Sequence, residues 1–166
     1  MSDRDIRYEL HPGDGLYPTC VGELSDAPRT LYVRGNPAVL SEPSLSIIGA
    51  RKASPYGIAC SELAAKVATQ AGLAVVSGGA LGCDQASGWA ALNEGGRHIV
   101  VLGTGADVVY PRSSGGLITR AIETGGAVVS LSPWGCGVRK FAFSRRNRVI
   151  AALSAALFIS EAGMPS

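Results

Sequence analysis

Five short apolar runs alternate with segments of helical spacing, and this rhythm restricts the possible folds more than any other feature. Each run is uninterrupted and rich in Val, Ile or Leu: 45–48, 73–77, 98–102, 127–131 and 156–160. Strands that are covered on both faces have this composition, as in a parallel sheet. Between the runs, helices are expected at 55–71, 83–94, 114–124 and 144–154. The alternation predicts an α/β fold with a doubly wound, mainly parallel sheet and right-handed crossovers.

Local signals support the expected helices at both of their ends. Ser54 followed by Pro55 is typical of a helix N-cap and first turn. Glycine follows three of the helices, at 72, 95–96 and 125–126, where a left-handed C-cap favours this residue. In the first helix, four apolar residues share one side at helical spacing, which we expect to be the buried side: Ile58, Leu63, Val67 and Ala71.

Residues 1–43 have a different character, because they hold five of the nine prolines and no long periodic run. We interpret them as a small irregular N-terminal arm, with one short helix near 18–24 and a short extended piece at 31–33. The expected organisation is therefore an arm at 1–43 and the α/β domain at 44–166.

Composition excludes several classes of protein. Only 17% of residues are charged and 46% are hydrophobic, which is too apolar for intrinsic disorder. No apolar run approaches the ~20 residues of a membrane span, and no signal peptide opens the chain. The formal net charge of +2 conceals an asymmetry, because residues 139–148 hold five cations and no acid while the rest is mildly acidic. Such a basic stretch suggests contact with nucleic acid.

The four cysteines lie far apart, with no CxxC spacing and no histidine near them in sequence. A structural zinc site has little support from this arrangement, and we expect no metal. Free thiols in a reducing cytoplasm are the better interpretation.

Ligands of open parallel sheets bind beyond the carboxyl ends of the strands, so the loops that follow the strands are the candidate site. Glycine occurs in four of these loops, at 49–54, 77–84, 103–105 and 132–137, and cations follow two of them. Glycine lets backbone N–H groups approach an anion, and a following helix adds its positive end. A phosphate-bearing ligand is therefore expected. The dinucleotide pattern GxGxxG and the Walker pattern are both absent, which argues against NAD and P-loop chemistry.

Several of these residues also have structural interpretations. The glycines can serve only as caps and turns, and Asp84 can be a helix N-cap rather than an acid. Trp134 can stack on a base or simply cover the core. Ser77 has no histidine in a neighbouring loop to activate it as a nucleophile, so we expect no catalytic residue.

In this context the chain resembles the DNA-processing protein A family, DprA/Smf. SIIGAR at 46–51, with Ser54, is similar to its first glycine motif, and VVSGGALGCD at 75–84 to its second. VLGTG at 101–105 with YP at 110–111 resembles the third, and FSRRNRVIAALS at 143–154 the last. LYVRGN at 31–36 is similar to the segment that precedes the family's Rossmann-like fold.

The resemblance implies a cytoplasmic, Rossmann-like protein that binds single-stranded DNA without turnover and without a cofactor. It further implies a role in natural transformation, RecA as a partner, and a homodimer. The DNA or phosphate contacts that it implies lie in the first three of the loops named above and in the basic stretch: Gly49, Arg51, Ser54, Ser77, Gly78, Ala80, Gly103, Lys140, Phe143, Arg146 and Asn147.

The chain also departs from the family pattern. The family usually has histidine where this chain has Gly88, and glutamate where it has Leu131. The sequence stops at 166, where the family continues through a further strand and helix, so we expect the domain to be incomplete or shortened there. An alternative is a nucleotide-binding sensor or a nucleotide hydrolase similar to the LOG phosphoribohydrolases, although their PGGxGTxxE motif is not seen.

Overall fold

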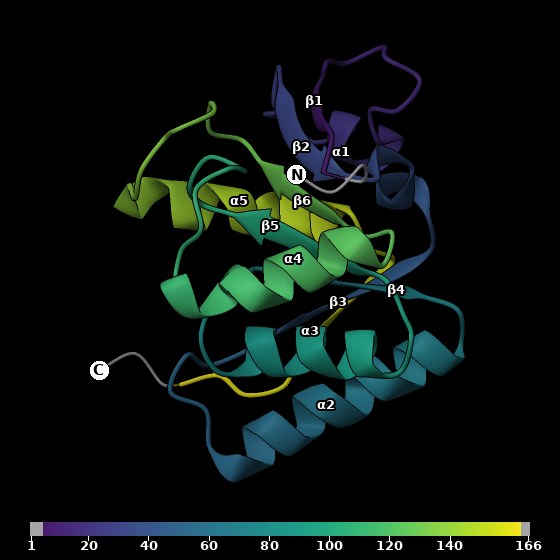
Figure 1. Cartoon of the computed structure of the whole chain (residues 1–166), viewed down its shortest axis with the longest axis vertical. Coiled ribbons are helices and arrows are strands. Elements are labelled where there is room, and N and C mark those ends of the chain that lie inside the picture. The colour runs from purple at the N-terminus through teal and green to yellow at the C-terminus, as the bar shows by residue number, and fades with distance from the viewer. Residues whose placement is uncertain (1–4, 164–166) are drawn as a thin grey trace.

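Each predicted apolar run forms a strand in the computed structural model, which describes residues 5–163 (Figure 1). These strands are β3 (Ser44–Ile48), β4 (Ala74–Ser77), β5 (His98–Leu102), β6 (Ala127–Ser130) and β7 (Ala156–Ile159). The helices between them are α2 (Pro55–Gln70), α3 (Cys83–Asn93), α4 (Gly115–Glu123) and α5 (Lys140–Ala152). Ser54 caps α2 as expected, because its hydroxyl accepts a hydrogen bond from the Gly57 amide.

The N-terminal segment contributes two more strands and a short helix. These are β1 (Arg7–Leu10), α1 (Thr19–Gly22) and β2 (Leu31–Gly35), and a 3-10 turn follows at Pro37–Ser41. The short helix and the extended piece are therefore confirmed. Both strands join the main sheet, where β2 runs antiparallel to β6 and β1 runs antiparallel to β2.

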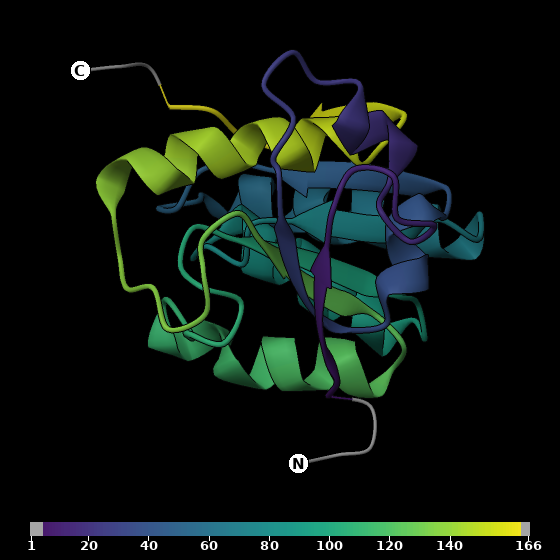
Figure 2. The same ribbon diagram turned by 90° about the horizontal axis from the view of Figure 1, so that it is seen from above.

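The sheet has seven strands in the order β1-β2-β6-β5-β4-β3-β7. Strands β3 to β7 are mutually parallel, which confirms the predicted mainly parallel α/β fold. Helices α2, α3 and α4 cover one face, and α5 with α1 covers the other (Figures 1 and 2). Alternate strand residues face the two layers, so Val75 and Val100 pack toward α3 and α4 while Val76 and Val101 pack toward α5.

Two expectations about the helices were wrong. Helix α5 begins at Lys140, four residues before the predicted start, because the basic residues that resemble a loop form its first turn. In α2 the apolar side does not face the core, since Leu63 is 64% exposed and Val67 is 57% exposed. The buried side instead carries small residues, which let α2 pack close to α3: Gly57, Ser61, Ala65 and Ala68.

Gly88, one of the departures from the family pattern, is explained by its neighbour on β5. A Cβ at this position of α3 would lie 2.6 Å from Nε2 of His98 and 3.0 Å from a methyl group of Leu117. His98 is fully buried, and its Nδ1 lies 2.9 Å from the carbonyl oxygen of Val75. The missing side chain of Gly88 therefore makes the space that the imidazole of His98 fills.

We expect Gly88→Ala to lower the free energy of unfolding by about 1–3 kcal/mol, despite the better helix propensity of alanine, because the new methyl group overpacks against His98. Urea denaturation measures this loss. Gly116→Ala is the matched control, since its Cβ would meet nothing nearer than 3.6 Å. Adding His98→Ala to Gly88→Ala should restore room, so the double variant should lose less than the sum of the two single losses. Strict additivity would contradict the packing explanation.

Candidate functional site

A small pocket lies where the loops after β3, β4 and β5 meet the start of α5. It measures about 80 Å³ and is lined by Arg51, Gly78, Ala80, Leu81, Tyr110, Pro111, Phe143 and Arg146. The Phe143 ring forms one wall and packs at a tilt against Tyr110, with 5.8 Å between the ring centroids. The structure therefore brings together five of the residues expected from sequence, from three separate motifs.

Leu81, Tyr110 and Pro111 were not among the expected site residues. Tyr110 and Pro111 did carry a signal, since they form part of the third motif of the resemblance. Leu81 carried no such signal, because the residue type alone does not distinguish a buried from an exposed apolar side chain in a glycine loop. All three supply apolar surface around the pocket, which suits a ligand with a flat apolar part next to its charge.

The glycine loop between β4 and α3 packs tightly against the loop after β3. Gly82 has φ +80, and a Cβ there would lie 2.6 Å from the carbonyl oxygen of Arg51. The amide of Cys83 donates to the carbonyl of Ala50 at 3.2 Å. Only glycine suits this combination of positive φ and close approach. The packing fixes Arg51 beside the pocket mouth.

Asp84 holds the same loop from beneath. Its carboxylate accepts a hydrogen bond from the Gly78 amide at 2.9 Å, and the amides of Gly49 and Ala80 also point toward it. Burial raises the pKa of this carboxyl, and the nearby Arg146 guanidinium and the three amides oppose that rise. Asp84 is therefore more than a helix cap, because it organises the backbone of both glycine loops.

Arg146 is built into the wall of the pocket rather than projecting into solvent. It is only 5% exposed, and its Nη1 donates to the carbonyl of Gly78 at 2.7 Å and to the carbonyl of Val101. Its Nε donates to Oδ1 of Asn147 at 3.0 Å. Burial lowers the pKa of Arg146, while the charge of Asp84 acts in the opposite direction. Arg146 thus ties β4 and β5 to α5.

The remaining expected residues lie around the pocket in different environments. Gly103 packs beneath the Phe143 ring, and Ser77 is fully buried with its hydroxyl 3.3 Å from the Asp84 carbonyl. Ser54 lies at the start of α2, where its hydroxyl and amide both donate to Glu161. Lys140 is exposed on the first turn of α5. Gly49, Ser54, Ser77, Gly103, Lys140 and Asn147 do not line the pocket itself.

Apart from Arg146, whose side chain is bonded to backbone carbonyls, the cations of the described residues fall into two groups. Five are held in ion pairs: Arg7, Arg34, Lys66, Arg97 and Arg148. In a second group, within residues 5–163, the side chains make no ion pair or hydrogen bond: Arg29, Arg51, Lys52, Arg112, Arg120, Arg139, Lys140 and Arg145. Arg120 lies on α4, and the other seven lie at the carboxyl edge of the parallel strands. Arg51 also lies over the Phe143 ring, with its Cζ 5.8 Å from the centroid. The unpaired positive charge is therefore concentrated at the edge of the sheet that holds the pocket.

Comparison with known proteins identifies the family. The family model described as DNA recombination-mediator protein A matches residues 9–166. The chain belongs to this family. It is 37% identical to the DNA processing protein DprA of Streptococcus pneumoniae over 155 residues, which cover 92% of this chain and 54% of that protein. It is 34% identical to protein Smf of Escherichia coli over 160 residues, covering 96% of this chain and 43% of Smf.

Solved structures of the family confirm the Rossmann-like fold. The X-ray structure of DprA from Streptococcus pneumoniae superposes with a TM-score of 0.85 at 34% identity and covers 99% of this chain and 56% of that one. The structure of DprA from Helicobacter pylori, which addresses the single-stranded DNA binding mode of that protein, superposes with a TM-score of 0.84 at 28% identity. The match covers 100% of this chain and 74% of that one. The chain spans about half the length of the curated relatives it matches.

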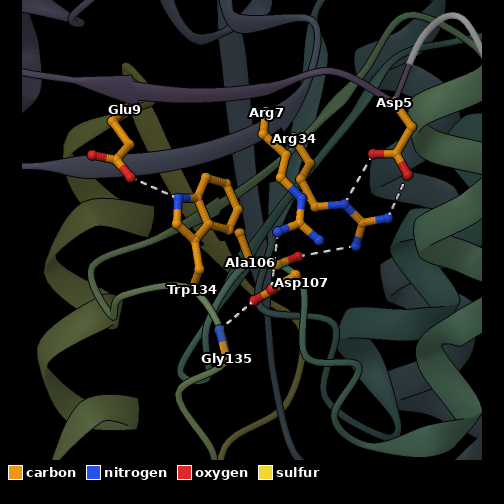
Figure 3. A network of polar contacts seen from close by, with 8 residues as sticks. All are labelled: Asp5, Arg7, Glu9, Arg34, Ala106, Asp107, Trp134 and Gly135. Atoms are coloured by element: carbon orange, nitrogen blue, oxygen red, sulfur yellow. Dashed lines mark hydrogen bonds and ion pairs between the residues drawn. The ribbon is translucent and has the colours of Figure 1, made fainter.

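Trp134, in the loop between β6 and α5, is held by the N-terminal strand (Figure 3). Its Nε1 donates to Glu9 at 2.7 Å, and the Cζ of Arg7 lies 5.0 Å from the ring centroid. Tyr32 meets the same ring edge to face, with centroids 5.4 Å apart. Trp134 therefore attaches its loop to β1 and β2. This agrees with the interpretation that Trp134 covers the core rather than stacks on a base.

Residues 5–163 hold neither a metal-binding cluster nor a helix that could span a membrane. No cluster of histidine, cysteine and acidic side chains there could hold a metal ion, and the four cysteines are free thiols. No helix in that range combines the length and apolarity needed to cross a membrane.

Proposed function

We propose that this domain binds single-stranded DNA, with the phosphates along the carboxyl edge of the sheet and one flat group against Phe143. The observation that carries the proposal is the gathering of unpaired cations around a pocket walled by Phe143 and Tyr110. Exposed cations neutralise phosphates, and aromatic rings stack on bases without regard to sequence. The Helicobacter pylori relative, which was studied for its single-stranded DNA binding mode, supports the same ligand.

In this proposal the expected contacts have two roles. Arg51 and Lys140 meet phosphates directly, because both are exposed and unpaired. Arg146 and Ser77 act from behind the surface, since both are buried and their donors are directed to backbone atoms. Gly78 and Ala80 offer backbone at the pocket wall. The proposed binding surface thus consists of glycine loops with exposed cations around them.

Turnover is not part of the proposal. The nearest approach to a Ser–His pair is Ser77 Oγ, 3.4 Å from Nε2 of His98, and both side chains are fully buried and inaccessible to a substrate. The pocket is also small for the alternative of a nucleotide sensor or hydrolase, since sites that enclose a small molecule hold roughly 300–1,000 Å³. The proposed ligand instead lies across the surface.

The family resemblance extends the proposal to the biological role. We infer that the protein acts in DNA processing during natural transformation, as a cytoplasmic homodimer that helps to load RecA. Two observations test this part: the molar mass of the protein in solution, and its effect on RecA assembly on a protected strand. Both are best made on the full-length gene product.

We expect Arg51→Glu to weaken binding of an oligothymidine about tenfold at low salt, because one phosphate contact is lost and a repulsive charge takes its place. Fluorescence anisotropy at several salt concentrations measures both affinity and contact number. The slope of log affinity against log salt should become shallower by roughly 0.7 for each contact removed from a single strand.

Arg120→Glu is the matched control for this experiment, because it makes the same charge change at an unpaired arginine on α4. It should leave both affinity and slope nearly unchanged. If the two substitutions had equal effects, DNA binding would depend on net charge alone, and this result would contradict a site at Arg51. Titration with mononucleotides completes the test, since tight mononucleotide binding without DNA binding would favour the sensor alternative.

A further inference from the structure

A second concave surface lies on the other side of α5 from the pocket. It is a groove of about 450 Å³ between residues 26–32 and α5, with Arg29, Leu131 and Arg145 among its lining residues. Asp26 also lines the groove, but its carboxylate is already bound to Arg148 at 2.6 Å. The charge left unpaired in the groove is therefore positive.

The direction of β2 explains how Arg29 comes to this place. Tyr32, the second residue of β2, pairs with Ser130, the last residue of β6, because the two strands are antiparallel. The loop that enters β2 consequently lies at the same edge where β6 ends. A cation from the N-terminal segment thereby joins the cations that follow the parallel strands.

Phe141 is an exposed aromatic residue in the first turn of α5. It is 63% exposed, although it stands only two residues before Phe143 in the pocket wall. Residues two apart on a helix point in nearly opposite directions, whereas residues four apart share one side. Phe141 therefore shares its side of α5 with Arg145, which lines the groove, and Phe143 points the other way.

We propose that a single strand held at the pocket continues across the start of α5, stacks a base on Phe141, and places its next phosphates in the groove of Arg29 and Arg145. This inference rests on the proposed function and adds a second contact surface to it. Single-stranded nucleic acid fits the surface because it offers both a flat apolar group for the exposed ring and regularly spaced negative charge for the two arginines.

The test compares a short and a long strand on the whole chain. We measure the affinity of oligothymidines of about 5 and about 20 nucleotides, since known single-strand sites span roughly 4–16 nucleotides. The wild type should bind the longer strand at least ~10-fold more tightly, because only that strand reaches Phe141 and the groove. Phe141→Ala, and separately Arg29→Glu with Arg145→Glu, should remove most of this gain and leave the short strand within ~2-fold of wild type.

Two controls keep the result specific. Arg120→Glu makes one charge reversal of the same kind outside the path, against two in the groove variant, and the circular dichroism of each variant reports folding, which these exposed positions should leave intact. A wild type that binds both lengths equally, or groove variants that behave like Arg120→Glu, would overturn this inference alone. A wild type that binds neither strand would overturn the proposed function, and this inference with it.

Discussion

Arg146→Ala should lower the free energy of unfolding by about 3–5 kcal/mol, because it removes a buried cation that donates to two backbone carbonyls and whose charge favours the ionised form of the buried Asp84. Asp84 would keep its three amide partners but lose this favourable charge, and the carbonyls of Gly78 and Val101 would lose their donor. Urea denaturation monitored by circular dichroism measures the loss. The variant should also bind DNA more weakly, because the loops that present the pocket are no longer held.

The neighbouring Arg145→Ala is the control for this prediction. It makes the same chemical change one residue away on an exposed side chain, where surface substitutions usually shift stability by less than about 0.5 kcal/mol. Adding Asp84→Asn to Arg146→Ala should recover part of the loss, because the stranded charge is then absent. Equal losses for Arg145→Ala and Arg146→Ala would show that the burial of Arg146 does not matter for stability.

Acid should destabilise the protein through His98. Burial lowers the pKa of this histidine from 6.5 to about 4 in the folded protein. Between these two pH values the unfolded chain binds more protons than the folded one, so stability falls as the pH falls from 6.5 toward 4. The full difference corresponds to about 3 kcal/mol, and about 2 kcal/mol of it should be lost by pH 5. The raised pKa of Asp84 acts in the opposite direction in acid.

His98→Gln tests this prediction, because glutamine keeps a donor for the Val75 carbonyl and does not titrate. The unfolding free energy of wild type and variant is compared at about pH 7 and about pH 5. The variant should lose about 2 kcal/mol less than the wild type over this range. Identical pH dependence in the two proteins would mean that His98 is not the group that responds.

The parallel core could be predicted from the sequence because β4, β5 and β6 are buried along their whole length and are therefore rich in Val, whereas β7 is apolar although all four of its residues are exposed. Strand β1 could not, because it has only four residues, two of them charged and exposed, and it is a strand through its pairing with β2. The buried side of α2 was also beyond prediction. Hydrophobic spacing indicated Leu63 and Val67, whereas close packing against α3 selected small residues.

The site was predictable as a location but less so in the roles of its residues. Glycine and cations after the strands indicated the right edge, since parallel strands end together. Arg145 and Arg146 have the same chemistry and are neighbours in sequence, yet a turn of 100° on the helix places one in the groove and the other inside the protein. Only the start and rotation of α5 decide this, and its first turn carries no capping side chain that would mark it.

The position of β2 beside β6 has a consequence for synthesis on the ribosome. Residues 31–35 leave the ribosome early, but the partner they pair with spans residues 127–130. At about 5–20 residues per second, the N-terminal strands therefore wait several seconds without their neighbour. The neighbouring strands β3, β4 and β5 follow one another along the chain and can associate meanwhile. The strands β1 and β2 are thus made before β6 but join the sheet only after it, and the groove at Arg29 is completed only then.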